Sequence, residues 1–156
     1  MKDNENIIEI LNDLIRINRD RIAGYEKAAD AIDDEDESLE SLFHQLADES
    51  VRIKEELTET VVAHGGEPAE DTTVSGKVYR VWMSVKDTFA GDDAKSTLEA
   101  CEFGEDAAQK AYAEALSESS ELPEALTLMI RDQKDLLKMS HDLIRNKRDQ
   151  YQEMDR

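Results

Sequence analysis

The chain has 156 residues, enough for one domain with a substantial hydrophobic core, and its net charge is −19. That charge argues against nucleic acid as a partner and against an anionic membrane surface, because both would repel the chain. With two prolines and six glycines among many Ala, Leu, Glu, Asp, Lys and Arg residues, the composition predicts long helices.

The sequence also indicates a cellular compartment. The single cysteine, Cys101, excludes an internal disulfide framework and fits a reducing environment. No apolar run approaches the roughly 20 residues of a membrane-spanning helix. The first residues, MKDNENII, lack the apolar core of a targeting peptide. We therefore expect a cytoplasmic protein with no membrane partner.

The first half of the chain predicts two long helices, over about residues 4–33 and 37–64. The apolar stripe of the first, interrupted by Asn18, consists of Ile8, Leu11, Ile15, Ile22, Tyr25, Ala29 and Ile32. Glu26 lies beside this stripe. In the second helix Glu49 occupies a stripe position between Leu46 and Ile53. A polar last turn, then glycine and proline, ends the second helix at His64.

Residues 67–73 predict a polar loop, and residues 74–89 a shorter amphipathic helix. Its valines would also allow a strand, but the spacing of three and four residues and the absence of a partner strand favour a helix. Trp82 and Phe89 lie on its apolar stripe. We expect this stripe to be buried, either lengthwise against the other helices or in a homodimer.

The second half predicts helices over about residues 93–117 and 123–150. The third long helix is unusual because two carboxylates, Glu102 and Glu105, fall on its inward face with Gly104 between them. In the last helix, Gln133 and His141 lie on or beside the apolar stripe. We expect Tyr25 and Tyr112 to be core tyrosines whose hydroxyl groups reach a polar layer, and Cys101 to be a small core residue.

These elements predict an all-α, ferritin-like four-helix bundle in a single domain, residues 1–156. Short turns join the helices into two antiparallel hairpins. The connection between the hairpins contains the helix at 74–89, which is roughly 24 Å long at about 1.5 Å per residue. It can return the chain along the bundle, so that the second and third long helices run parallel, as in one-crossover bundles.

This topology brings polar side chains from all four long helices toward one level of the core. We expect a layer that contains Glu26, Glu49, Glu102, Glu105 and His141, with Gln133 below it. Buried carboxylates must be protonated, paired with cations or bound to a metal ion. Carboxylate oxygens with one imidazole suit iron or manganese.

The segments GYEKAAD, LADES, GGEPAED, GKVYRVWMSVK and LEACEFGEDAAQKAYAEAL resemble a bacterial family of ferritin-like four-helix bundles of unknown function. The resemblance covers nearly the whole chain and is most specific at Tyr25–Glu26 and at residues 99–106. Ferritin-like carboxylate proteins use one glutamate from each of two helices and a Glu-x-x-His pair from each of the other two.

By this resemblance, Glu26 and Glu102 match the single glutamates, Glu49 the glutamate of one pair, and His141 the histidine of the other. The chain departs from the pattern at two positions. Arg52 stands where the first pair needs histidine, and Lys138 stands where the second needs glutamate. Neither charged side chain can bind a metal ion.

Two classes of function follow. The first is a metal-binding bundle, in which Glu26, Glu49, Glu102, Glu105 and His141 hold iron or manganese and support oxidase-like chemistry. The second is a non-enzymatic structural or stress-associated bundle, in which the core carboxylates pair with Arg52 and Lys138 and bind no metal.

Overall fold

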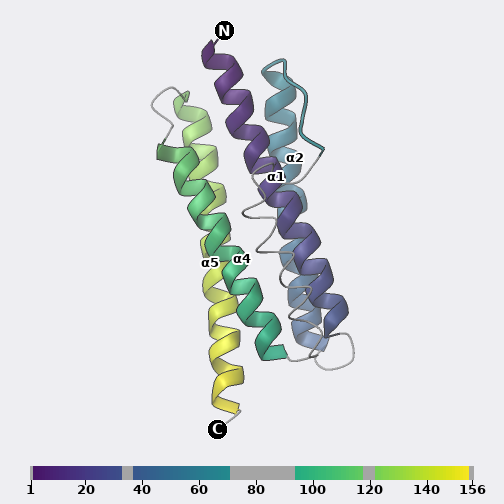
Figure 1. Ribbon diagram of the computed structural model, residues 1–156. Coiled ribbons are helices and arrows are strands. Elements are labelled where there is room, and N and C mark those ends of the chain that lie inside the picture. Colours follow the sequence, from purple (N-terminus) through teal and green to yellow (C-terminus); the bar gives the residue numbers. More distant parts are fainter. Residues whose placement is uncertain (1, 33–36, 71–93, 118–121, 155–156) are drawn as a thin grey trace.

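A computed structural model describes residues 2–32, 37–70, 94–117 and 122–154. The regular secondary structure of these ranges is helical, and they contain no strand (Figure 1). The helices are α1 (Lys2–Ala31), α2 (Glu37–Ala63), α4 (Ala94–Ser117) and α5 (Glu124–Met154). The predicted all-α class is confirmed. The predicted helix at 74–89, with Trp82 and Phe89, lies outside the described residues.

Local sequence accounts for the helix ends. The carbonyl of Pro123 accepts bonds from the backbone N–H groups of Leu126 and Thr127, and these bonds open α5. A proline is tolerated there because a first-turn residue needs no N–H donor. At the end of α2, the N–H of Gly65 donates to the Val62 carbonyl and the N–H of Gly66 to the Val61 carbonyl. This is a Schellman motif, and Gly65 adopts the positive φ of 81° that the motif requires.

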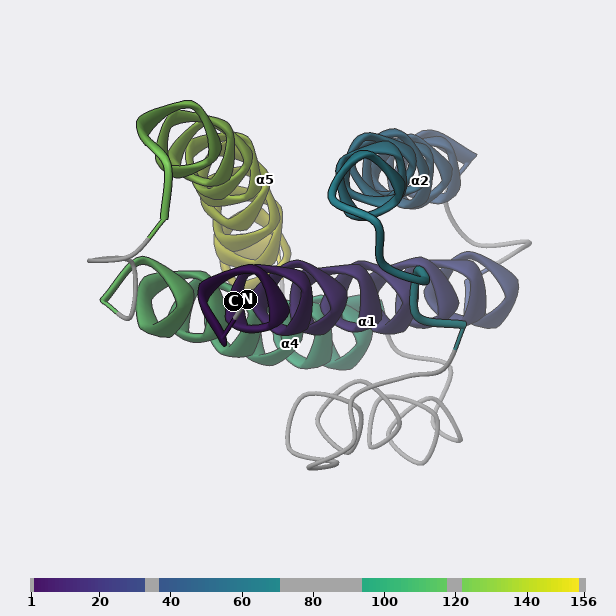
Figure 2. The same cartoon turned by 90° about the horizontal axis from the view of Figure 1, so that it is seen from above.

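The four helices pack in two layers. Seen from above, α1 and α4 lie side by side, α2 covers α1, and α5 covers α4 (Figure 2). Following the colours in Figure 1, α1 and α5 run in one direction while α2 and α4 run in the other. Because α2 and α4 run parallel, the last residue of α2 and the first residue of α4 lie toward opposite ends of the bundle. None of the described helices is both long and apolar enough to cross a membrane.

The core is continuous along the bundle, and α1 contributes to it at intervals of three and four residues. Its fully buried side chains include Leu11, Leu14, Tyr25 and Ala28. In the middle of α1 three polar side chains, Asn18, Asp20 and Arg21, are as completely buried as the apolar ones, and Asn18 and Arg21 lie within this stripe. Burying a guanidinium group destabilises the fold unless the group is paired. The side chains that surround Arg21 are therefore central to the stability of this bundle.

We predict that Gly65→Ala lowers the free energy of unfolding by about 1–2 kcal/mol, because an alanine resists a positive φ. A Cβ atom at this position would meet nothing within 4 Å, so the loss comes from the backbone alone. Gly65→Asn should cost less, because asparagine tolerates this conformation. Urea unfolding measures both, and equal stability of all three proteins would contradict the motif.

Candidate functional site

The central feature of the core is a charged layer organised by Arg21 of α1. Its Nε donates to Glu105 Oε1 at 2.6 Å and its Nη2 to Glu105 Oε2 at 2.8 Å, a bidentate pair with α4. Its Nη1 donates to Ser50 Oγ at 2.6 Å and lies 3.2 Å from Glu49 Oε1, both on α2. The side chains of Arg21 and Glu105 are both fully buried, so water does not screen the pair.

Two hydroxyl groups complete this layer. Tyr25 donates to Glu105 Oε2 at 2.9 Å, and Ser140 of α5 donates to Glu49 Oε1 at 2.8 Å. The guanidinium carbon of Arg21 also lies 5.2 Å from the centre of the Tyr25 ring, within cation–π range. All four helices therefore contribute to one network around the buried guanidinium group of Arg21.

Electrostatics keep this layer charged. Burial alone would lower the pKa of the Arg21 guanidinium, but the facing carboxylates, above all Glu105, raise it above its ordinary value. Burial, followed by the nearby Glu105 carboxylate, raises the pKa of the Tyr25 hydroxyl well above its usual range. Tyr25 thus stays a neutral donor and Arg21 stays a cation at neutral pH.

A second polar layer lies about two helical turns, roughly 10 Å, from the first on α2, α4 and α5, and less than one turn from Arg21 on α1. Asn18 donates to the Tyr112 hydroxyl at 3.0 Å, and that hydroxyl donates to Gln133 Oε1 at 2.9 Å. Gln133 Nε2 then donates to Glu56 Oε1 at 2.7 Å. This chain again includes one residue from each helix. The predicted core roles of Tyr25 and Tyr112, and the predicted burial of Gln133, are confirmed.

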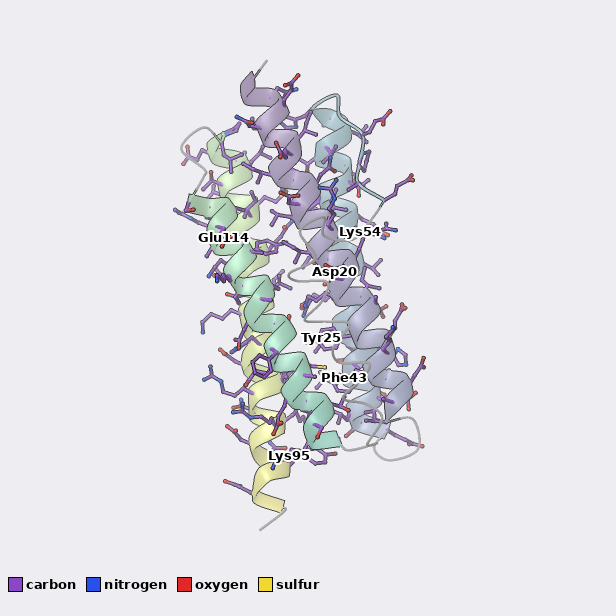
Figure 3. The ribbon with its side chains drawn as sticks, in the orientation of Figure 1. Asp20, Tyr25, Phe43, Lys54, Lys95 and Glu114 are labelled. Atoms are coloured by element: carbon purple, nitrogen blue, oxygen red, sulfur yellow. The ribbon has the colours of Figure 1, made fainter. Side chains whose placement is uncertain are left out.

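Cys101 faces the charged layer. Its thiol is fully buried, and burial followed by the Glu105 carboxylate raises its pKa well above the usual range. On the neighbouring side, the rings of Tyr25 and Phe43 lie next to each other, with centroids 5.8 Å apart (Figure 3). The charged layer is therefore surrounded by apolar contacts, and Cys101 acts as a small core residue, as predicted.

Of the five residues proposed from the sequence, Glu49 and Glu105 meet in the charged layer. The other three lie apart from it. Glu26 is exposed on α1. Glu102 is at the edge of the bundle, hydrogen-bonded to Arg148 and 3.8 Å from Arg145. His141 points toward α4 between two carboxylates.

The contacts of His141 explain its burial. Its Nε2 lies 2.5 Å from Asp106 Oδ1 on α4, and its Nδ1 lies 3.2 Å from Asp142 Oδ1. The hydrogen bond to His141, followed by that from Lys138, holds the pKa of Asp142 below its ordinary value. His141 therefore links α4 to α5 through its hydrogen bonds to Asp106 and Asp142.

The cations that pair with the core carboxylates differ from those expected. The sequence argument assigned this role to Arg52 and Lys138, but Arg52 is exposed and Lys138 pairs with Asp142 at the surface, at 3.2 Å. Arg21 has the role instead. It was missed because a charged residue was left out of the apolar stripe. Its spacing, three after Asn18 and four before Tyr25, is the signal that would have found it.

Whether this layer suits a metal ion can be judged from its donors. Both oxygens of Glu105 and Oε1 of Glu49 face the Arg21 guanidinium, which carries the positive charge that a metal ion would bring. Among the described residues, no group of three or more His, Cys, Asp or Glu side chains could hold a metal ion. With Arg21 in place, the residues present do not fit an iron or manganese site.

The fold and this layer define the chain as an all-α four-helix bundle with a buried ionic core. A sequence family described as a domain of unknown function, DUF2383, matches residues 6–118. This match covers more than half of the chain, and the chain belongs to that family. A search of curated proteins finds no significant match.

We predict that Glu105→Gln lowers the free energy of unfolding by about 3–5 kcal/mol, because it leaves the buried Arg21 cation without its carboxylate. The matched variant Glu102→Gln breaks an ion pair at the edge of the bundle and should cost no more than about 1 kcal/mol. Urea unfolding measures both losses. Equal losses would mean that the buried pair stabilises the fold no more than the ion pair at the edge.

We also predict that Cys101 does not react with an aromatic disulfide reagent in the native protein and reacts fully in urea. The cause is the combination of complete burial and a raised thiol pKa. A control variant, Ala113→Cys, adds a second thiol at an exposed position of α4, and that thiol should react at once. Rapid reaction of Cys101 in the native parent protein would show that the layer is open to solvent.

Proposed function

We propose that this protein is a ferritin-like bundle in which Arg21 takes the place of a core metal ion, and that it acts as a non-enzymatic structural or interaction module in the cytoplasm. The observation that carries the proposal is the bidentate contact of the buried Arg21 with Glu105, closed by Glu49, Ser50 and Tyr25.

The ferritin-like part of the proposal rests on topology and on the layer. The helices α2 and α4 run parallel, each antiparallel to α1 and α5, and ferritin-like bundles with one long crossover share that arrangement. Such bundles place polar groups from all four helices at one level of the core. The described helices do the same around Arg21.

The non-enzymatic part rests on the hydrogen bonds of the charged layer, whose polar groups bond to one another. A catalytic site needs a side chain or a metal ion that is free to contact the substrate. Here Glu105 uses both oxygens, Tyr25 donates to Glu105, and Ser50 accepts from Arg21. The layer therefore serves to hold four helices in one arrangement.

The competing hypothesis places iron or manganese among Glu26, Glu49, Glu102, Glu105 and His141, and a metal titration separates the two. Ligands that bind only the folded state raise its stability. We predict that manganous or ferrous ion leaves the melting temperature of the parent protein unchanged. A rise in the parent that is lost in Glu102→Ala would instead support the metal site.

The variant Arg21→Ala provides the matched test. It removes the guanidinium and leaves Glu49 and Glu105 facing the vacated space together with two hydroxyl groups, an oxygen-rich set that suits Mn²⁺. We predict that manganous ion raises the melting temperature of this variant, and that Arg21→Ala combined with Glu105→Gln loses the rise. No rise in Arg21→Ala would contradict the view that Arg21 stands in the place of a cation.

A further inference from the structure

A groove of about 590 Å³ separates α2 from α5 on the side of the bundle where these two helices face each other. Its two walls differ in chemistry. The α5 wall is mainly apolar, with Leu128, Met129 and Leu136, but it also carries Asp132 on the same face of the helix. The α2 wall is charged and includes Glu49, Arg52 and Glu56. A ligand that fits both walls must itself have an apolar face and a charged face.

The apolar wall belongs to a longer stripe on α5. Leu128, Leu136, Met139 and Leu143 are 52%, 45%, 68% and 39% exposed. Their spacings of eight, three and four residues place them on one face of the helix. This face is separate from the one that enters the core through Ile130, Leu137 and Ile144. A second apolar stripe left in solvent is the usual mark of an interaction surface.

The charged wall is acidic and held in position. Glu49 Oε1 is anchored by Ser140 and Arg21, and Glu56 Oε1 by Gln133. Each of the two polar layers of the core thus ends at a carboxylate on this wall. Asp132 adds a third acidic group to the lining, against the single cation Arg52. Carboxylates that are already ordered lose little entropy when a cation binds them.

We propose that this groove binds a basic amphipathic helix of a partner protein. The apolar face of that helix would lie on the α5 stripe, and its lysine or arginine side chains would reach Glu49, Glu56 and Asp132. Amphipathic helices recognise grooves in this way. The stripe from Leu128 to Leu143 is roughly 22 Å long, so about four turns of the partner helix would be in contact.

Charge decides between this occupant and a second copy of the chain. Two copies with a net charge of −19 repel each other, and pairing their α5 stripes would bring two acidic walls together. A cationic helix gains from the same field, which also speeds its approach. The inference rests on the proposed role as an interaction module, and its test uses the intact parent protein.

The probe is a labelled synthetic peptide of about 18 residues, long enough for four to five turns, with leucine and lysine at amphipathic helical spacing. We expect it to bind the parent protein in a fluorescence anisotropy titration, and to bind more weakly as salt is raised. A scrambled peptide of the same composition, and a peptide with glutamate in place of lysine, should each bind at least about tenfold more weakly.

Variants then locate the site. Leu128→Ser combined with Leu136→Ser removes exposed side chains, so the fold should survive, and the affinity should fall about tenfold or more. Phe103→Ser removes another exposed apolar side chain, on α4, and should change the affinity less than about twofold. Glu56→Gln should weaken the salt dependence of binding.

Three results would overturn the proposal. The first is no binding of the basic peptide. The second is that the Leu128→Ser, Leu136→Ser variant binds the peptide as tightly as the parent protein does. Binding would then be a general attraction of a basic peptide to an acidic protein. The third is a parent dimer that this variant dissociates, which would assign the stripe to a second copy. The manganese experiment on Arg21→Ala tests only the core layer, and the peptide titration tests only the groove. The two proposals can therefore fail separately.

Discussion

The buried pair of Arg21 and Glu105 is the interaction on which the rest of this structure depends. A guanidinium group removed from water destabilises a fold by several kcal/mol unless a carboxylate and further hydrogen bonds meet it in good geometry. The bidentate contact meets this requirement from α4, and Ser50 with Glu49 meets it from α2. Because these partners come from two other helices, α2 and α4, the cation can be satisfied in only one arrangement of the bundle.

The second polar layer strengthens this constraint. Apolar stripes alone allow helices to slide by a turn at little cost, whereas polar groups lose their partners when the register changes. Asn18, Tyr112, Gln133 and Glu56 form one chain across the four helices, about two turns from Glu105 on α4 and less than one turn from Arg21 on α1. Two layers at a fixed separation determine both the register and the directions of the helices. They also hold in place the acidic wall of the groove between α2 and α5.

Much of this architecture follows from the sequence, because helical spacing and helix-ending signals are local. The four long helices and the Gly65 terminus are examples. The identity of the central cation did not follow. Arg21 occupies a stripe position between Asn18 and Tyr25, but a search for apolar periodicity passes over a charged residue. Glu102 and Glu105 lie three residues apart on one face, and only packing against α1 and α5 decides which is buried. Such choices depend on neighbours far away in the sequence.

The central claim is that Arg21 and Glu105 stabilise the bundle as a coupled pair, and a double-mutant cycle measures this most directly. The cycle compares the parent, Arg21→Met, Glu105→Gln and the double variant in urea unfolding. If the claim is correct, the double variant loses little more stability than either single variant, so the coupling energy is close to the loss in one single variant, about 3 kcal/mol. Losses that simply add would contradict the claim, since they would mean that the two side chains contribute independently.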